Sequence, residues 1–180
     1  MPDPEFILLG DALWLDLVNT ARSRTHDRAD RFQSPADYHR WTKAEKLASD
    51  ADTVPFEEVL EVRERLTALA ASLAAGRRPP AASVDALNRA LARQPGRAQL
   101  TRSAGRWSLH LTPDEALRAL EAVAWSAAMT LSDSHAAVRE CAGAACDLFF
   151  LDRTPGHTRR FCSAATCGQA ARVERRRRPR

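Results

Sequence analysis

The four cysteines of this chain all fall within its last 40 residues, at Cys141, Cys146, Cys162 and Cys167. They form two pairs, with four residues inside each pair and 15 residues between the pairs. A structural zinc ion takes four thiolate or imidazole ligands in a tetrahedron, and two short cysteine pairs separated by a loop can supply them. We therefore expect these four residues to bind one structural zinc ion, because a segment this short cannot hold a fold without such a staple.

Two disulfides are the alternative use of four cysteines, and disulfides require an oxidising compartment. The chain starts with Met1-Pro-Asp-Pro-Glu, which lacks the basic start and the apolar stretch of a secretion signal. No apolar run approaches the roughly 20 residues that cross a bilayer. We therefore expect reduced thiols in a cytoplasmic protein that does not span a membrane, and we favour zinc over disulfides.

A zinc ion with four thiolates has no free coordination position, whereas a catalytic zinc keeps one position for water. His157 lies between the pairs and could replace one cysteine, but a polar loop histidine beside two arginines is more simply explained by solvation. The sequence contains no H-E-x-x-H, no G-x-S-x-G and no glycine-rich phosphate loop. We therefore predict no catalytic residues and expect a protein that is not an enzyme.

The C-terminal end of the chain is basic, since residues 139–180 contain ten arginines and four acidic residues, whereas the remainder carries a net charge of −2. Arginine side chains match phosphate oxygens and guanine edges, so the clustered arginines predict nucleic-acid contacts. A solvated basic tail is the alternative, and an excess of arginine over lysine can also reflect genomic base composition. The candidates flank the second cysteine pair and include three residues that share one side of a helix opened by Cys167-Gly168: Arg159, Arg160, Arg172, Arg175 and Arg176.

The sequence predicts the α+β class, and the part of the chain before the cysteines is expected to form a predominantly helical domain with a small β-sheet. The apolar strings at 6–9 and 13–18 indicate either a hairpin or a strand followed by a helix, and a polar segment follows at 21–33. A β-hairpin is predicted over 97–111, and a break at Asp133-Ser134 divides the chain into domains 1–133 and 134–180. Capping residues and apolar spacing predict further helices over 34–48, 55–76, 83–93 and 112–132, the last opened by a capping box at Thr112-Pro-Asp-Glu115.

Polar residues near the end of the second apolar string are candidates for binding a small molecule. Asp16, Asn19 and Thr20 could converge on a ligand, with Trp41 as a stacking wall. The alternative is structural, because Asn and Thr after a strand commonly satisfy local backbone groups and tryptophan commonly lies in a core. Both interpretations stay open at the level of sequence.

The sequence resembles two known protein families, one in each part of the chain. The C-terminal part resembles the CGNR zinc-finger family in Arg139-Glu-Cys-Ala-Gly-Ala-Ala-Cys-Asp-Leu-Phe-Phe-Leu-Asp-Arg, in Arg159-Arg-Phe-Cys-Ser and in Cys167-Gly-Gln-Ala. The first 130 residues resemble the ABATE domain, especially in Leu15-Asp-Leu-Val-Asn-Thr20, in Ser34-Pro-Ala-Asp37 and at Trp41. The two resemblances cover nearly the whole chain and occur in the order of the family.

The resemblance implies a bacterial transcription regulator, with a treble-clef-like zinc module that binds DNA and an α/β domain that senses a ligand or forms a homodimer. By matching position, the four cysteines inherit the role of metal ligands. The chain departs from the family at Gln169-Ala170, where the name-giving motif has Asn-Arg. The alternative function is a zinc-stabilised protein interaction module whose arginines dock on an acidic partner.

Overall fold

The computed structural model describes residues 5–9, 11–25, 30–92, 96–103, 106–113 and 117–177, with only backbone pairing described between 96 and 113. Two antiparallel hairpins pair β1 (Gly96–Ser103) with β2 (Arg106–Pro113) and β3 (Ala137–Glu140) with β4 (Phe149–Asp152). The predicted α+β class, with a mostly helical N-terminal part, is confirmed. The helices are α1 (Leu13–Asn19), α2 (Pro35–Ala44), α3 (Phe56–Ala74), α4 (Ala81–Ala92), α5 (Ala119–Ser132), the π-helical turn η1 (Ala164–Gly168) and α6 (Gln169–Arg177).

Local sequence signals mark the start of α2 and both ends of α3 as predicted, whereas α2 ends at Ala44 and not at the predicted residue 48. Pro35 occupies the first turn of α2, and the Asp37 carboxylate accepts hydrogen bonds from the Gln33 N–H (2.8 Å) and the Ser34 hydroxyl (3.0 Å). Burial acts to raise the pKa of Asp37, but these hydrogen bonds outweigh it and lower the pKa. The last turn of α3 is followed by Gly76 at φ 65°, a left-handed conformation that glycine adopts without strain.

Two predicted elements differ in the structure. Residues 6–9 form no strand, so the open choice at this end of the chain resolves into an extended segment followed by α1. The predicted start of the fifth helix at Thr112 is wrong, because Thr112 and Pro113 pair with β1 in the hairpin. Helix α5 begins at Ala119 instead, where the Glu121 carboxylate accepts from the Arg118 N–H at 2.9 Å. Residues 114–116, and the side chains of the predicted hairpin, lie outside the described parts.

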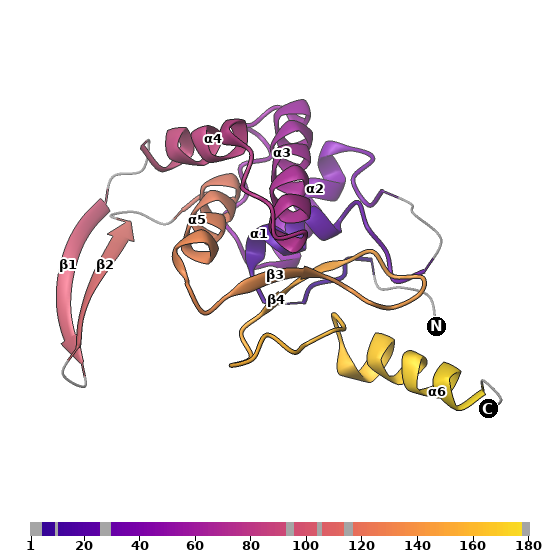
Figure 1. Ribbon diagram of the computed structural model, residues 1–180. Helices are drawn as coiled ribbons and strands as arrows, with labels where there is room; N and C mark the ends of the chain where they lie inside the picture. The colour runs from indigo at the N-terminus through magenta and orange to yellow at the C-terminus, as the bar shows by residue number, and fades with distance from the viewer. Residues whose placement is uncertain are drawn as a thin grey trace.

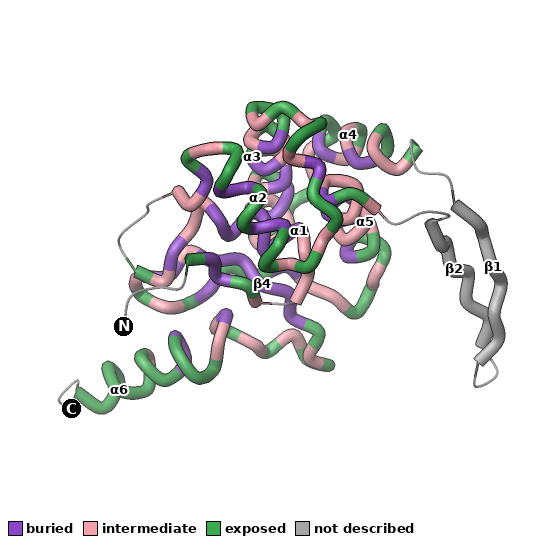
Figure 2. The backbone as a smooth tube through the Cα atoms, turned by 180° about the vertical axis from the view of Figure 1, so that it is seen from behind, coloured by how far each residue is buried: buried purple, intermediate pink, exposed green. Residues whose placement is uncertain are grey.

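Helix α1 is the centre of the N-terminal core, and every residue from Trp14 to Thr20 is buried. It packs against α3 and α5, and the Trp14 indole donates to the Thr130 hydroxyl at 3.0 Å (Figures 1 and 2). None of the helices in the described ranges combines the length and the hydropathy that a bilayer crossing requires. The hydrophobic effect of this core, rather than helix propensity, therefore organises the first five helices.

The polar segment before α2 is anchored by a buried arginine of α3. Both Arg63 terminal nitrogens bond to the Asp30 carboxylate, at 2.7 and 2.6 Å, and one also donates to the Thr20 hydroxyl at 3.0 Å. The Arg63 guanidinium also lies 5.1 Å from the ring centre of Phe32, which is itself buried. This planar fork satisfies a buried charge and positions the chain that enters α2.

The β3–β4 hairpin lies between the N-terminal helices and the cysteine-containing segment (Figure 1). Its side chains alternate between two cores, as the period of a β-strand requires. Val138, Phe149 and Leu151 belong to the core of the helices, whereas Leu148 and Phe150 pack with the four cysteines. The hairpin is therefore a wall shared by both parts of the chain, and the predicted boundary at Asp133-Ser134 stays a prediction.

Asn19 attaches this wall to α1 through two reciprocal hydrogen bonds. Its side-chain amide donates to the Phe149 carbonyl at 2.9 Å and accepts from the Phe149 N–H at 3.0 Å. All of these groups are buried, so water cannot replace either bond without opening the core. Asn19 acts as a side-chain substitute for a neighbouring β-strand.

We predict that Asn19→Ala destabilises the protein by about 2–4 kcal/mol, because it leaves a buried N–H and a buried C=O without partners. The measurement is urea unfolding of the zinc-loaded protein. Asn88→Ala is the matched control, since Asn88 is exposed on α4. Equal stabilities of the two variants would contradict the assigned role of Asn19.

Candidate metal centre and arginine groove

The four cysteines converge in one buried cluster although they come from separate turns. Cys141 follows β3, Cys146 precedes β4, Cys162 precedes η1, and Cys167 lies within η1. Their sulfur atoms all lie within 4.8 Å of one another, with Cys146 to Cys162 at 3.8 Å and Cys162 to Cys167 at 3.6 Å. A tetrahedron with Zn–S bonds of about 2.3 Å requires sulfur atoms about 3.8 Å apart. The cluster therefore fits one structural zinc ion.

The surroundings of Cys141 are those of a thiolate. Its sulfur accepts from the backbone N–H of Cys162 at 3.3 Å and from that of Gly143 at 3.4 Å. A Cβ atom at Gly143 would lie 3.2 Å from Cβ of Cys146 and 3.3 Å from Cβ of Cys167, so a larger residue here would press on two of the cysteines. The two N–H groups orient the Cys141 sulfur and stabilise its negative charge, as hydrogen bonds to metal-binding side chains commonly do.

Four neighbouring thiols cannot all ionise without a cation. Hydrogen bonds from Cys146 and then Cys162 lower the pKa of Cys141, and the same contacts with Cys141 raise the pKa of both partners. A divalent ion supplies the charge that permits four thiolates in so small a volume. All four cysteines are free of disulfides, and His157 is not part of the cluster that the described residues form.

Arg159, predicted to contact nucleic acid, connects the zinc module to the segment before α1. Its guanidinium donates to the carbonyls of Leu151 (3.1 Å), Phe161 (3.1 Å) and Cys162 (2.5 Å), and pairs with the Asp11 carboxylate at 2.9 Å. It also stacks 4.6 Å from the ring centre of Phe150. Four of its five N–H donors are thus used within the protein, so Arg159 has a structural role in addition to any contact it makes outside.

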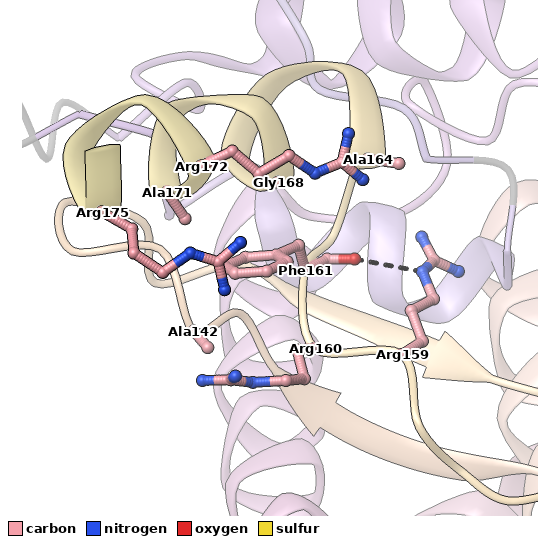
Figure 3. Close-up of a pocket in the computed structure, with 9 residues that line it drawn as sticks. All are labelled: Ala142, Arg159, Arg160, Phe161, Ala164, Gly168, Ala171, Arg172 and Arg175. Atoms are coloured by element: carbon pink, nitrogen blue, oxygen red, sulfur yellow. Dashed lines mark hydrogen bonds between the residues drawn. The ribbon is translucent and has the colours of Figure 1, made fainter.

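Three of the other predicted arginines lie around an open groove between α6 and the loop before Cys162 (Figure 3). Arg172 and Arg175 extend from α6 over the side where Arg160 and Phe161 lie, and all three arginines are exposed. The Arg160 guanidinium lies 5.8 Å from the ring centre of Phe161. The groove has a volume of about 570 Å³ and is also lined by Arg159; the rest of its lining is small: Ala142, Ala164, Gly168 and Ala171. Arg176 is exposed on α6 but does not line it.

The four residues considered as ligand contacts lie in the N-terminal core. Asp16 is 2% exposed and accepts from the Leu9 N–H at 2.7 Å, and Thr20 bonds to the Leu17 carbonyl and to Arg63. Asn19 holds the Phe149 backbone, and Trp41 is fully buried in a stack against Tyr38. The structure therefore favours the structural alternative for this set.

Some site residues were not anticipated from the sequence. Ser163 caps η1 by accepting from the Thr166 N–H at 3.3 Å, and its position three residues before Thr166 was a readable capping signal. Asp11 carried no such signal, because its partner Arg159 lies 148 residues away. Phe149 belongs to the helical core although its neighbour Phe150 packs with the cysteines, since strand alternation turns the two side chains to opposite faces.

We predict that one zinc ion per chain is released by a strong chelator and that its loss unfolds the C-terminal module. Helix α6 has no buried residue, so little else would hold it in place. Mass spectrometry under native conditions measures the zinc content before and after chelation. Backbone NMR spectra of the same two samples show whether the module unfolds. Zinc binding should weaken as the pH falls, since protons compete for the thiolates. An unchanged spectrum of residues 141–177 after zinc loss would contradict this prediction.

We predict that Arg159→Ala lowers the free energy of unfolding by about 1–3 kcal/mol, because it removes the donors of three backbone carbonyls. Arg160→Ala is the matched control, and it should change stability by less than about 0.5 kcal/mol, as is usual for an exposed side chain. Urea unfolding with zinc present measures both. Equal losses would show that Arg159 does not connect the module to the rest of the chain.

Comparison with protein families agrees with this geometry. The ABATE model, described as "Putative stress-induced transcription regulator", matches residues 11–134, and the CGNR zinc-finger model matches residues 137–180. A comparison with curated proteins found no match. The ABATE match covers more than half of the chain, and the second match contains all four clustered cysteines. The chain therefore belongs to the ABATE family and carries a CGNR zinc finger behind its ABATE domain.

Proposed function

We propose that this protein is a transcription regulator that binds DNA through its zinc module. The observation that carries the proposal is the groove in which the exposed Arg160, Arg172 and Arg175 surround Phe161. The three guanidinium groups come from two segments that the zinc ion would hold together. Each guanidinium is a planar group of N–H donors that can bond to phosphate oxygens or to the edge of guanine, as arginines commonly do in nucleic-acid-binding sites.

Helix α6 has the shape and exposure that a groove-binding helix needs. Its nine residues span about 14 Å, and none of them is buried (Figure 2). It projects from the molecule on the far side of β3–β4 from the helical core (Figure 1). The major groove of B-DNA, about 12 Å wide, admits a helix of this kind. Helix α6 can therefore approach DNA without a change in the rest of the fold.

The departure from the family motif falls on the first two residues of α6. Gln169 and Ala170 are both exposed, and neither is needed to hold the cysteine cluster. Gln169 keeps a side-chain amide that can bond to adenine, whereas Ala170 removes one positive charge. We therefore expect DNA binding that depends on Arg160, Arg172 and Arg175 and reads a sequence different from that of motif-bearing relatives.

We propose a regulator rather than an enzyme, since four thiolates leave zinc no open position for catalysis. Docking on an acidic protein partner is the second candidate, because the same arginines would serve it. A response to a small molecule, or assembly as a homodimer, would be the task of the N-terminal domain. A lone zinc module with one helix makes few base contacts, so pairing of two copies would increase specificity.

The test is fluorescence anisotropy of labelled duplex DNA with the full-length zinc-loaded protein, over a series of salt concentrations. We expect salt-dependent binding, and a triple variant with Arg160, Arg172 and Arg175 changed to Ala should bind more weakly. If all three contact phosphates, the slope of log K against log salt should fall by about 2.7. This variant removes no buried contact, so its stability should stay near that of the unchanged protein.

The matched control changes Arg77, Arg78 and Arg89 to Ala, which removes the same charge from exposed positions in the N-terminal domain. If both triple variants weaken binding equally, the effect is one of net charge and the groove is not the binding site. If the unchanged protein fails to bind duplex DNA even at low salt, the proposal is wrong and the acidic protein partner becomes the better candidate.

A further inference from the structure

A cleft between α3, α4 and α5 has no role in the zinc module or the arginine groove. Its volume is about 320 Å³. An engineered protein cavity of about 150 Å³ already accommodates benzene, and small-molecule sites begin at about 300 Å³. The space therefore fits a molecule of about two fused rings. It is too small to seat a helix or a second copy of the chain.

The walls of the cleft are mostly apolar and come from three helices. Val62 and Leu66 of α3, Leu87 of α4 and Leu120 and Val123 of α5 supply the larger surfaces. Small side chains leave the space open where the helices meet: Ser83, Ala86, Ala90 and Ala124. The Ser83 hydroxyl is directed to the Arg65 carbonyl at 3.1 Å, so it offers the cleft no free donor. An apolar molecule would gain most from entering such a space.

The most deeply buried charged group in the wall is Asp50, which is 3% exposed. One of its oxygens accepts from the Tyr38 hydroxyl at 2.6 Å and the other accepts from the Leu120 N–H at 3.1 Å. A carboxylate offers about four acceptor positions, so Asp50 can take another donor while keeping both bonds. The cleft therefore offers a fixed, buried acceptor beside apolar walls.

The charged groups around the cleft favour a ligand that donates a hydrogen bond over a ligand that carries a negative charge. Glu58 and Glu121 line it together with Asp50, against Arg65 and Arg118. The Arg65 guanidinium is paired with Glu61 on the outer side of α3. The lining thus holds three acidic groups against two arginines, so a ligand carboxylate would enter a net negative site at a cost in free energy, whereas an N–H group meets acceptors.

We propose that this cleft binds a small, uncharged aromatic molecule of about two rings that donates one hydrogen bond to Asp50. The cleft would be the place where the N-terminal domain senses a ligand, in a different position from Asp16, Asn19, Thr20 and Trp41. A regulatory role for this ligand rests on the proposed DNA-binding function, whereas binding of the ligand to the cleft does not.

The test uses indole as the probe and isothermal titration calorimetry of the full-length zinc-loaded protein at two temperatures. We expect saturable binding of one indole per chain with a negative heat-capacity change, because apolar surface becomes buried. Indole-3-acetate should bind at least about tenfold more weakly, because its carboxylate must be desolvated beside Asp50. Binding of indole-3-acetate as tight as that of indole would overturn the proposed donor selectivity.

Ala90→Phe should fill the cleft and weaken indole binding by more than about tenfold, because the ring would occupy the volume of the ligand. Ala82→Phe is the matched control, since Ala82 is exposed on the same helix. If Ala90→Phe prevents folding, Ala86→Val gives a milder obstruction of the same space. Backbone NMR shifts on adding indole should cluster at α3, α4 and α5.

No heat and no shifts up to the solubility limit of indole would overturn the inference, and so would equal binding by Ala90→Phe and Ala82→Phe. DNA binding is measured separately by anisotropy. A protein that binds DNA but not indole contradicts this inference alone, and one that binds indole but not DNA contradicts the proposed function alone.

Discussion

The attraction between one divalent cation and four thiolates is the interaction on which the C-terminal part depends. Helix α6 buries none of its residues, and the core around the cysteines has few other apolar members, mainly Ile7, Leu148 and Phe150. Apolar burial on this scale cannot offset the entropy of ordering some 40 residues. The zinc ion supplies the missing free energy and also sets the distance between α6 and the Arg160 loop. The arginine groove is therefore a consequence of the metal site.

Attachment of this module to the helices rests on groups far apart in the sequence. Asn19 substitutes for a strand beside Phe149, Arg159 joins Asp11 to the carbonyl groups around Cys162, and Arg22 stacks 4.0 Å from the ring centre of Phe149. These contacts are directional and largely shielded from water, so they resist sliding of one part over the other. The two cores meet across the single hairpin β3–β4, which makes the zinc module part of one framework with the helices.

Much of this architecture could be predicted from local sequence, because caps, prolines and apolar spacing act over short distances. Pro35, Pro55 and Gly76 mark helix ends, and the spacing of the cysteines alone indicates that they cluster. What local sequence does not show has a common physical reason. Thr112 resembles a helix cap but pairs with β1, and the backbone partner of Asn19 lies 130 residues away along the chain. Likewise, the assembly of Val62, Leu87 and Leu120 around one cleft depends on tertiary packing alone.

Helix α3 is the physical link between the proposed ligand cleft and the zinc module. Val62 and Leu66 form part of the cleft, and the same helix packs against β3, which leads directly to Cys141. A ligand changes DNA affinity only if it binds two arrangements of the protein with different affinities. A shift of α3 could reach the cysteine cluster only through its packing on β3, and Asn19, which fixes β3–β4 to α1, would oppose that movement. If the ligand changes the affinity of the protein for DNA by some factor, DNA must change the affinity for the ligand by the same factor.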